Sequence, residues 1–191
     1  MHIGLFFGSF NPIHHGHLII AETAQTLTDL DRVWLVVSPQ NPFKQKKNLL
    51  SEYHRLRMVE LGIGDSYTLQ ASNVEFHLPQ PSYTVDTLLH LREKYPGYTF
   101  SLVMGADNLL HLSKWKNHEA ILEHYRLFVY PRNGKRPSSQ FDEHEHVTFF
   151  EAPLLDISAT YIRESLKKDH SIRYLVPDPV KEYLEEIRAY R

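Results

Sequence analysis

Residues 3–17 read Ile3-Gly-Leu-Phe-Phe-Gly-Ser-Phe-Asn-Pro-Ile-His-His-Gly-His17, an apolar run that gives way to a loop rich in turn-forming residues. Gly8 and Pro12 bound the apolar run, which predicts a short buried strand followed by a turn. Apolar residues then recur at helical spacing, at Leu18, Ile19, Ala21, Ala24 and Leu27. The opening of the chain is therefore expected to fold as a strand, a loop and a helix.

The same alternation continues along the rest of the chain. Further strands are expected at 33–37, 68–74, 99–104, 126–130 and 147–150. Helices are expected at 51–61, 85–95, 108–112, 117–124, 158–168 and 179–189, with Ser51 and Asp178 as N-caps of the first and last of these and Pro179 at the first helical position. This order predicts an α/β fold: a Rossmann-like, mostly parallel sheet flanked by helices, with a small C-terminal helical region. In such a fold, ligands bind outside the carboxyl ends of the strands.

Length and composition favour one ordinary globular domain. The chain has 191 residues and a formal net charge of −2, and we expect a single domain over 1–191 whose part from about 156 to 191 is helical. The charge balance argues against a nucleic-acid partner, and no apolar run reaches the roughly 18 residues of a membrane span. The sequence contains no cysteine, which excludes disulfides, thiolate metal sites and thiol nucleophiles. A cytoplasmic location is expected, and the oligomeric state, including a homo-oligomer, stays open.

The loop after the first strand has the features of an anion site. Gly8 lets a phosphate approach the backbone, and Gly16 opens the following helix. His14 and His17 are three residues apart, so their rings can share one face of the helix start and donate N–H groups to phosphate oxygens. Two alternatives are surface or core histidines without a ligand, and a transition-metal site that includes His15. The metal site is disfavoured because adjacent side chains on a helix point about 100° apart.

A second candidate anion site lies near the other end of the chain, in Asp156-Ile-Ser-Ala-Thr-Tyr-Ile-Arg163. Ser158 and Thr160 offer hydroxyls and backbone amides at a helix start, and Arg163 follows one turn after Thr160. A capped helix with a surface arginine is the alternative interpretation.

These motifs carry a family resemblance. The pattern G-x-F-x-P-x-H-x-G-H resembles the signature of the nucleotidyltransferases with an H-x-G-H motif, and 157–163 resembles the adenylyltransferase signature I-S-S-T-x-x-R with Ala159 as the one departure. Residues 81–88 and 104–115 look like the S-Y-T-x-D-T and G-A-D…W segments of the bacterial nicotinate-mononucleotide adenylyltransferases. Residues 173–184 are similar to the C-terminal region of that family, so the resemblance spans nearly the whole chain.

The resemblance implies a reaction in which the 5′-phosphate of nicotinate mononucleotide attacks the α-phosphorus of ATP, giving the dinucleotide and pyrophosphate. It implies that Mg²⁺ is held mainly by the ATP phosphates. The catalytic residues implied are His14, His17, Lys44 and Arg163; the ATP-binding residues are Gly8, Ser9, Phe10, Gly16, Gly105, Asp107, Ser158 and Thr160; and the mononucleotide-binding residues are Thr84, Trp115 and Lys116. The family often has a histidine where this chain has Phe43.

Other interpretations stay open from the residues alone. A phosphopantetheine adenylyltransferase shares both phosphate motifs, and a non-catalytic nucleotide or metal sensor is the alternative from another class. Locally, Trp115 can be a core or rim aromatic, Lys44 a solvated charge, and Thr84 and Asp107 helix caps. The run Glu143-His-Glu-His146 reads as a hydrated loop more readily than as a metal site.

Overall fold

The computed structural model describes residues 1–39, 49–131, 138–153 and 155–190. Six strands form one parallel sheet in the order β3-β2-β1-β4-β5-β6. Their bounds are β1 His2–Gly8, β2 Arg32–Val37, β3 Leu69–Ser72, β4 Thr99–Gly105, β5 Leu127–Tyr130 and β6 Val147–Phe149. This is the Rossmann strand order. The chain adds β2 and β3 on one side of β1 and then β4, β5 and β6 on the other side, so the loop after β1 lies at the topological switch point. The expected Rossmann-like parallel sheet is confirmed.

Both faces of the sheet are covered, and β1 shows why. Phe6 is buried in one core with side chains from the N-terminal and C-terminal helices, whereas Ile3 and Leu5 are buried in a second core on the opposite face. The period-2 alternation of a strand sends its apolar side chains to both faces, as a parallel sheet between two layers requires.

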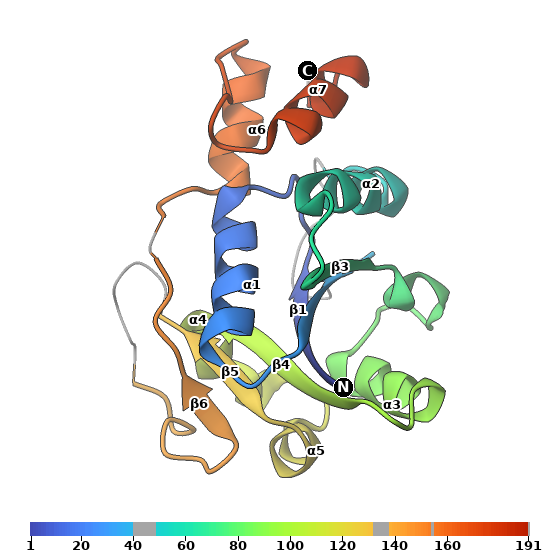
Figure 1. The fold of residues 1–191 in the computed structure, drawn as a ribbon, viewed down its shortest axis with the longest axis vertical. Helices are drawn as coiled ribbons and strands as arrows, with labels where there is room; N and C mark the ends of the chain where they lie inside the picture. Colours follow the sequence, from blue (N-terminus) through green and yellow to red (C-terminus); the bar gives the residue numbers. More distant parts are fainter. Residues whose placement is uncertain (40–48, 132–137, 154, 191) are drawn as a thin grey trace.

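The helices divide between these two cores. The helices in chain order are α1 His15–Leu27, α2 Glu52–Ile63, α3 Thr84–Lys94, α4 Ala106–Leu110, α5 His118–His124, α6 Ala159–Lys167 and α7 Asp178–Glu186, with 3-10 turns η1 Val74–His77 and η2 Leu112–Lys114. The core around Phe6 takes buried residues from α1, α2, α6 and α7, and the core around Leu5 takes them from α3, α4 and α5. Figure 1 shows α6 continuing above the N-terminal end of α1, with α7 packed beside α2.

Several element boundaries differ from the sequence prediction. The strand expected at 68–74 is only Leu69–Ser72, because the chain turns into η1 at Val74. The strand expected at 147–150 ends at Phe149, and the helix expected at 108–112 begins earlier, at Ala106, directly after β4. The loop expected at 132–146 consists of turns over 138–146, and 132–137 lie outside the described residues.

The expected Ser51 cap is confirmed, and the expected Asp178 cap is wrong. The Ser51 Oγ accepts a hydrogen bond from the His54 amide at 3.4 Å, and Ser158 caps α6 in the same way. The N-cap of α7 is Pro177, so Asp178 is the first helical residue and Pro179 the second. The Asp178 carboxylate still lies in the first turn, where the helix dipole favours negative charge. In the described part of the chain, no helix combines the length and apolar character needed to cross a membrane.

Candidate active site

The loop after β1 is built on a buried phenylalanine. Phe10 has a left-handed backbone (φ 44°), and its ring is 2% exposed. The ring packs edge-on against Phe6 and His17, with centroids 6.0 and 5.1 Å apart. A Cβ on Gly8 would lie 2.7 Å from the Phe10 Cζ, so only glycine leaves room for the ring in this position. The Phe10 ring therefore packs against the His17 ring, and it is too buried to contact a ligand.

His14 and His17 form a stacked pair at the start of α1. His14 is the N-cap residue, and the two rings lie 3.7 Å apart between centroids with an interplanar angle of 26°. A Cβ on Gly16 would approach the His14 Nδ1 to 3.0 Å, so this glycine provides the space that the His14 ring occupies. The first turn of α1 contains no acidic residue. The pair thus lies at the positive end of a helix dipole, an arrangement suited to an anion.

The start of α6 is brought to this same place. The Ser158 Oγ accepts a hydrogen bond from the Tyr161 amide at 3.2 Å. Arg163 donates one hydrogen bond to the Thr160 Oγ1 at 3.1 Å and another to the backbone oxygen of Asn11 at 2.8 Å. Figure 1 shows the N-terminal ends of α1 and α6 meeting beside the loop that follows β1. Two helix N-termini and an arginine from distant parts of the chain therefore converge on one site.

Asn11 connects this loop to two further segments. Its side-chain oxygen accepts hydrogen bonds from the Leu50 amide at 3.2 Å and from the Tyr190 hydroxyl. Burial raises the pKa of the Tyr190 hydroxyl, which keeps it protonated as the donor in this bond. The sequence did not indicate that Leu50 and Tyr190 contact Asn11, because nothing in their local sequence points to a partner so far along the chain.

A second part of the candidate site follows β4. Gly105 is the N-cap residue of α4, and Asp107 lies in the first turn of this helix. The Asp107 carboxylate occupies the space where a Cβ on Gly105 would stand, so glycine is required for this close approach. The cap of α4 is thus Gly105, and the interpretation of Asp107 as its N-cap is wrong.

Thr84 and Trp115 belong to two segments that a salt bridge joins. Thr84 is the first residue of α3, whose N-cap is Tyr83, so the interpretation of Thr84 as the N-cap is wrong. Trp115 follows η2 and is half-buried against the core around Leu5. Lys116 pairs with Asp86 of α3 at 2.8 Å, and its ammonium lies 4.8 Å from the centre of the Tyr83 ring. The Lys116 charge is therefore already compensated by Asp86, and both side chains are exposed enough for the pair to be weak.

Glu75 is a buried carboxyl group that the sequence did not single out. It lies in η1, is 3% exposed, and accepts a hydrogen bond from the Thr87 hydroxyl at 2.9 Å. Burial raises the pKa of Glu75, an effect opposed by its hydrogen bond with the Thr87 hydroxyl. The carboxyl group thus links η1 to the first turn of α3, the helix that begins at Thr84.

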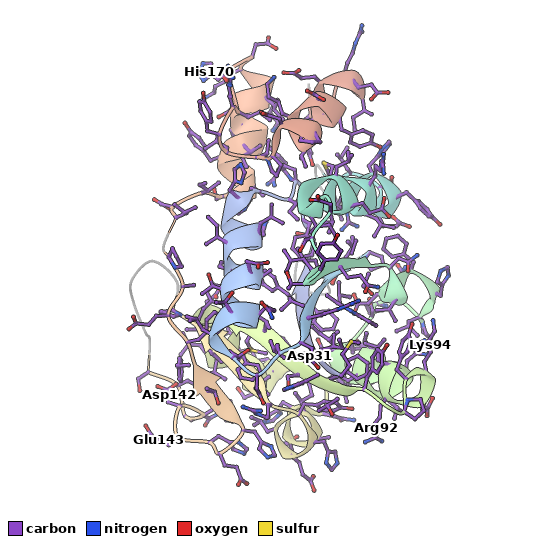
Figure 2. All side chains as sticks on the ribbon, viewed as in Figure 1. Asp31, Arg92, Lys94, Asp142, Glu143 and His170 are labelled. Carbon is purple, nitrogen blue, oxygen red and sulfur yellow. The ribbon has the colours of Figure 1, made fainter. Side chains whose placement is uncertain are left out.

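The structure brings together most but not all of the expected residues. His14, His17, Ser158, Thr160 and Arg163 meet around the loop after β1, whereas Lys44 lies outside the described residues. His15 donates its backbone amide to the Leu175 oxygen at 3.1 Å. The loop at 143–146 is remote from this site: Figure 2 shows Asp142 and Glu143 at the end of the molecule opposite His170 and the C-terminal helices. Within the ranges that the structure describes, no three or more His, Asp or Glu side chains are grouped to hold a metal ion.

A Rossmann-type sheet with paired histidines at its switch point and a second, arginine-bearing helix start beside them define a nucleotidyltransferase. The comparisons agree, since a family model described as cytidylyltransferase-like matches residues 5–165. A relative from Cytophaga hutchinsonii is 54% identical over 100% of this chain and 98% of its own length, and one from Flavobacterium psychrophilum is 50% identical over the full length of both. Both bear the name "probable nicotinate-nucleotide adenylyltransferase". The chain belongs to the nicotinate-nucleotide adenylyltransferase family.

Solved structures share the fold at lower identity. A nicotinic acid mononucleotide adenylyltransferase of Plasmodium falciparum, complexed with NaAD, superposes with a TM-score of 0.82 at 21% identity, covering 99% of this chain and 97% of its own. A putative nicotinate-nucleotide adenylyltransferase of Vibrio parahaemolyticus superposes with a TM-score of 0.73 at 24% identity, covering 100% and 95%. At these identities the likeness supports the architecture alone.

The raised pKa of Glu75 predicts a pH dependence of stability. The pKa of this carboxyl group is higher in the folded state than its ordinary value of 4.5. Its contribution to stability is therefore fully present below pH 4.5 and is lost as the pH rises through the folded-state pKa. The free energy of unfolding of the wild type should therefore fall relative to that of Glu75→Gln as the pH rises from 4.5, by at most about 1.4 kcal/mol per pH unit. Urea unfolding of both proteins between pH 4.5 and 8 measures the difference. Parallel stability curves would contradict the assignment.

Proposed function

We propose that the chain transfers the adenylyl group of ATP to the 5′-phosphate of nicotinate mononucleotide, giving nicotinate adenine dinucleotide and pyrophosphate, a step of NAD biosynthesis. The observation that carries the proposal is the stacked pair of His14 and His17 at the start of α1, with Arg163 bonded to the same loop. The family relationship supports the choice of both substrates.

The chemistry requires positioning more than acid–base help. A phosphate monoester is already ionised near neutral pH, so the attacking oxygen is a competent nucleophile, and the main obstacle is to bring two polyanions into line. The new bond joins the mononucleotide phosphate to the α-phosphorus, and the bond to the β-phosphate breaks to release pyrophosphate. No covalent intermediate with the protein is needed.

Each proposed catalytic residue offsets a particular negative charge. His14 and His17 donate ring N–H groups to oxygens around the α-phosphorus, where the dipole of α1 adds to their effect. Arg163, with Lys44, neutralises charge that develops on the leaving pyrophosphate. Arg163 is half-buried and held by Thr160, which limits the entropy lost when it meets a phosphate.

The remaining ATP contacts come from backbone and short side chains. The residues proposed for this role are Gly8, Ser9, Phe10, Gly16, Gly105, Asp107, Ser158 and Thr160. Because the Phe10 ring is buried, this residue can offer ATP only its backbone groups. Asp107 accepts hydrogen bonds from ribose hydroxyls, at a position that the absent side chain of Gly105 leaves free.

Mg²⁺ enters this proposal as part of the Mg–ATP substrate. The described residues offer no group of three or more His, Asp or Glu side chains that would form a protein cage, which fits a cation carried mainly by phosphate oxygens. The ion reduces the negative charge of the triphosphate when bound. The histidines and the arginine then act on the oxygens that remain.

The mononucleotide is proposed to bind across α3 and η2. Trp115 stacks on the nicotinate ring, and Thr84 with neighbouring amides binds its carboxylate at the N-terminal end of α3. Lys116 can contribute positive charge only in competition with Asp86, its present partner. The Lys116–Asp86 pair bridges these two segments on the surface.

One assay tests the reaction directly. The purified protein is mixed with Mg–ATP and, in parallel, nicotinate mononucleotide, nicotinamide mononucleotide or phosphopantetheine, and pyrophosphate release is measured. We expect the highest rate with nicotinate mononucleotide, because its carboxylate is the group that the start of α3 favours. Release with phosphopantetheine alone would identify the other adenylyltransferase activity, and release with none of the three would refute the proposal.

His17→Ala should lower kcat by about 100-fold or more, the usual scale for one lost transition-state donor, with the fold intact. The reason is that His17 is stacked on His14 and supported by Phe10, so its ring cannot be replaced by a neighbour. His15→Ala is the matched control on the same turn and should keep near-normal turnover. Near-normal kcat in His17→Ala would remove the central residue of the mechanism.

Trp115→Ala should raise KM for nicotinate mononucleotide by about 10-fold or more, since aromatic stacking on a base is worth roughly 1–3 kcal/mol. KM for ATP should change little, because Trp115 packs against the core on the opposite face of the sheet from Phe10, whose ring contacts His17. Trp115→Phe keeps an aromatic face and should recover much of the loss. Steady-state kinetics with each substrate varied in turn measures both constants, and an equal rise in the two would argue against stacking.

A further inference from the structure

Arg55 of α2 is fully buried and bonded only to backbone oxygens in the contacts that the structure describes. Its side chain is 0% exposed. The Nε donates to the Leu50 oxygen at 2.9 Å, the Nη1 donates to the oxygens of Ser9 and Ser38 at 2.7 Å each, and the Nη2 donates to the Pro39 oxygen at 3.0 Å. Among the described residues, no carboxylate makes an ion pair with this guanidinium.

The oxygens that Arg55 binds come from separate segments at the carboxyl edge of the sheet. Ser9 follows β1, Ser38 and Pro39 follow β2, and Leu50 immediately precedes the Ser51 cap of α2. The planar guanidinium has five N–H donors in a fixed geometry, so one side chain sets the relative positions of all these segments. A flexible ammonium or a neutral amide has too few fixed donors to do the same.

The bond to Ser9 also determines a peptide orientation inside the proposed ATP loop. The carbonyl and the N–H of a trans peptide point in opposite directions. Because the Ser9 oxygen points at Arg55, the amide N–H of Phe10 points away from it. This amide is the donor that Phe10 has left to offer a phosphate, since the Phe10 ring is buried.

Leu50 links Arg55 to the second phosphate motif. Its backbone oxygen accepts from Arg55 while its amide donates to the Asn11 side chain. Asn11 in turn accepts a hydrogen bond from Arg163 on its backbone oxygen. A displacement of Arg55 would therefore move the loop after β1 directly, through Ser9. It would also disturb Arg163, through the hydrogen bonds of Leu50 and Asn11.

We propose that Arg55 is a positioning residue for adenylyl transfer, which orients the ATP-binding loop after β1 without touching either substrate. This inference rests on the proposed function for the identity of the nucleotide. It requires the arginine to affect ATP and the transfer step and to leave recognition of the mononucleotide largely unchanged, because α3 and η2 carry no bond to it among the described contacts.

The test compares Arg55→Lys and Arg55→Met with the wild type. Arg55→Lys keeps the charge but cannot span all the carbonyls, so kcat should fall and KM for ATP rise, with kcat/KM for ATP lower by about 100-fold, as expected for a misplaced site. KM for nicotinate mononucleotide should stay within about 3-fold of the wild type, a difference too small to indicate a lost contact. Thermal unfolding records whether each variant folds, and if Arg55→Met does not, Arg55→Lys decides.

Arg57 provides the matched control on the same helix. Its side chain is exposed and pairs with Glu60 at 3.4 Å, so Arg57→Lys and Arg57→Met should leave all kinetic constants near the wild type. Wild-type kinetics in Arg55→Lys, or an equal rise in KM for both substrates, would overturn the positioning role.

A binding measurement separates this proposal from the identity of the acceptor. Calorimetric titration with a non-hydrolysable ATP analogue should show weaker binding, by about 10-fold or more, to Arg55→Lys than to the wild type, whatever the acceptor is. If the wild type binds the analogue but forms no product with nicotinate mononucleotide, the proposed acceptor is wrong while the role of Arg55 stands. Equal affinity of both proteins for the analogue refutes the role of Arg55.

Discussion

Backbone oxygens at the carboxyl edge of the sheet impose the constraint on which this structure depends. The strands end where the ladder can no longer supply partners, and a buried carbonyl without a hydrogen bond costs about 1–3 kcal/mol. Arg55 binds the oxygens at the ends of β1 and β2 and before α2, and Arg163 binds the Asn11 oxygen. The irregular loop after β1 can therefore be both buried and well defined. An apolar side chain at either arginine would fill the volume but leave these oxygens unpaired.

Two helix N-termini converge on that loop, and their positive dipole ends repel each other when no ligand is bound. A bound polyanion turns this repulsion into attraction. The N-terminal ends of α1 and α6 are both positive ends of helix dipoles, and Arg163 adds a full positive charge beside them. Like partial charges repel at this range. Caps and hydrogen bonds, such as Ser158 to Tyr161 and Arg163 to Thr160, offset part of the repulsion. A triphosphate removes the rest, so the electrostatic balance of this site favours nucleotide over water.

What could be predicted from the sequence was the information that is local in the chain. The β1–loop–α1 unit, the parallel sheet and the Ser51 cap all follow from spacing or from residues within one turn, and all are confirmed. The roles of Arg55 and Glu75 were not found, because a charged residue in a helix or turn gives no sign that tertiary packing will bury it. The Lys116–Asp86 pair was missed because its members are far apart in sequence. The prediction that Asp178 is the N-cap of α7 was wrong by one residue, because the sequence pattern does not determine the first residue of a helix that accurately.

The two cores on either side of the sheet explain how one site can serve two different substrates. The proposed phosphate-binding residues lie on segments that pack into the core around Phe6, namely the loop with Phe10 and Ile13 and the C-terminal helices. The proposed nicotinate-binding residues stand on the core around Leu5, through α3 and the segment that ends at Trp115. The loops after β1 and β4 begin side by side at the carboxyl edge of the sheet, the first contributing to the core around Phe6 and the second to the core around Leu5. A change of acceptor preference can thus be made by repacking α3 and η2 while the histidine pair and its supporting phenylalanine keep their geometry. The reacting atoms must meet across that edge, which is where Arg55 binds the backbone oxygens that follow β1 and β2.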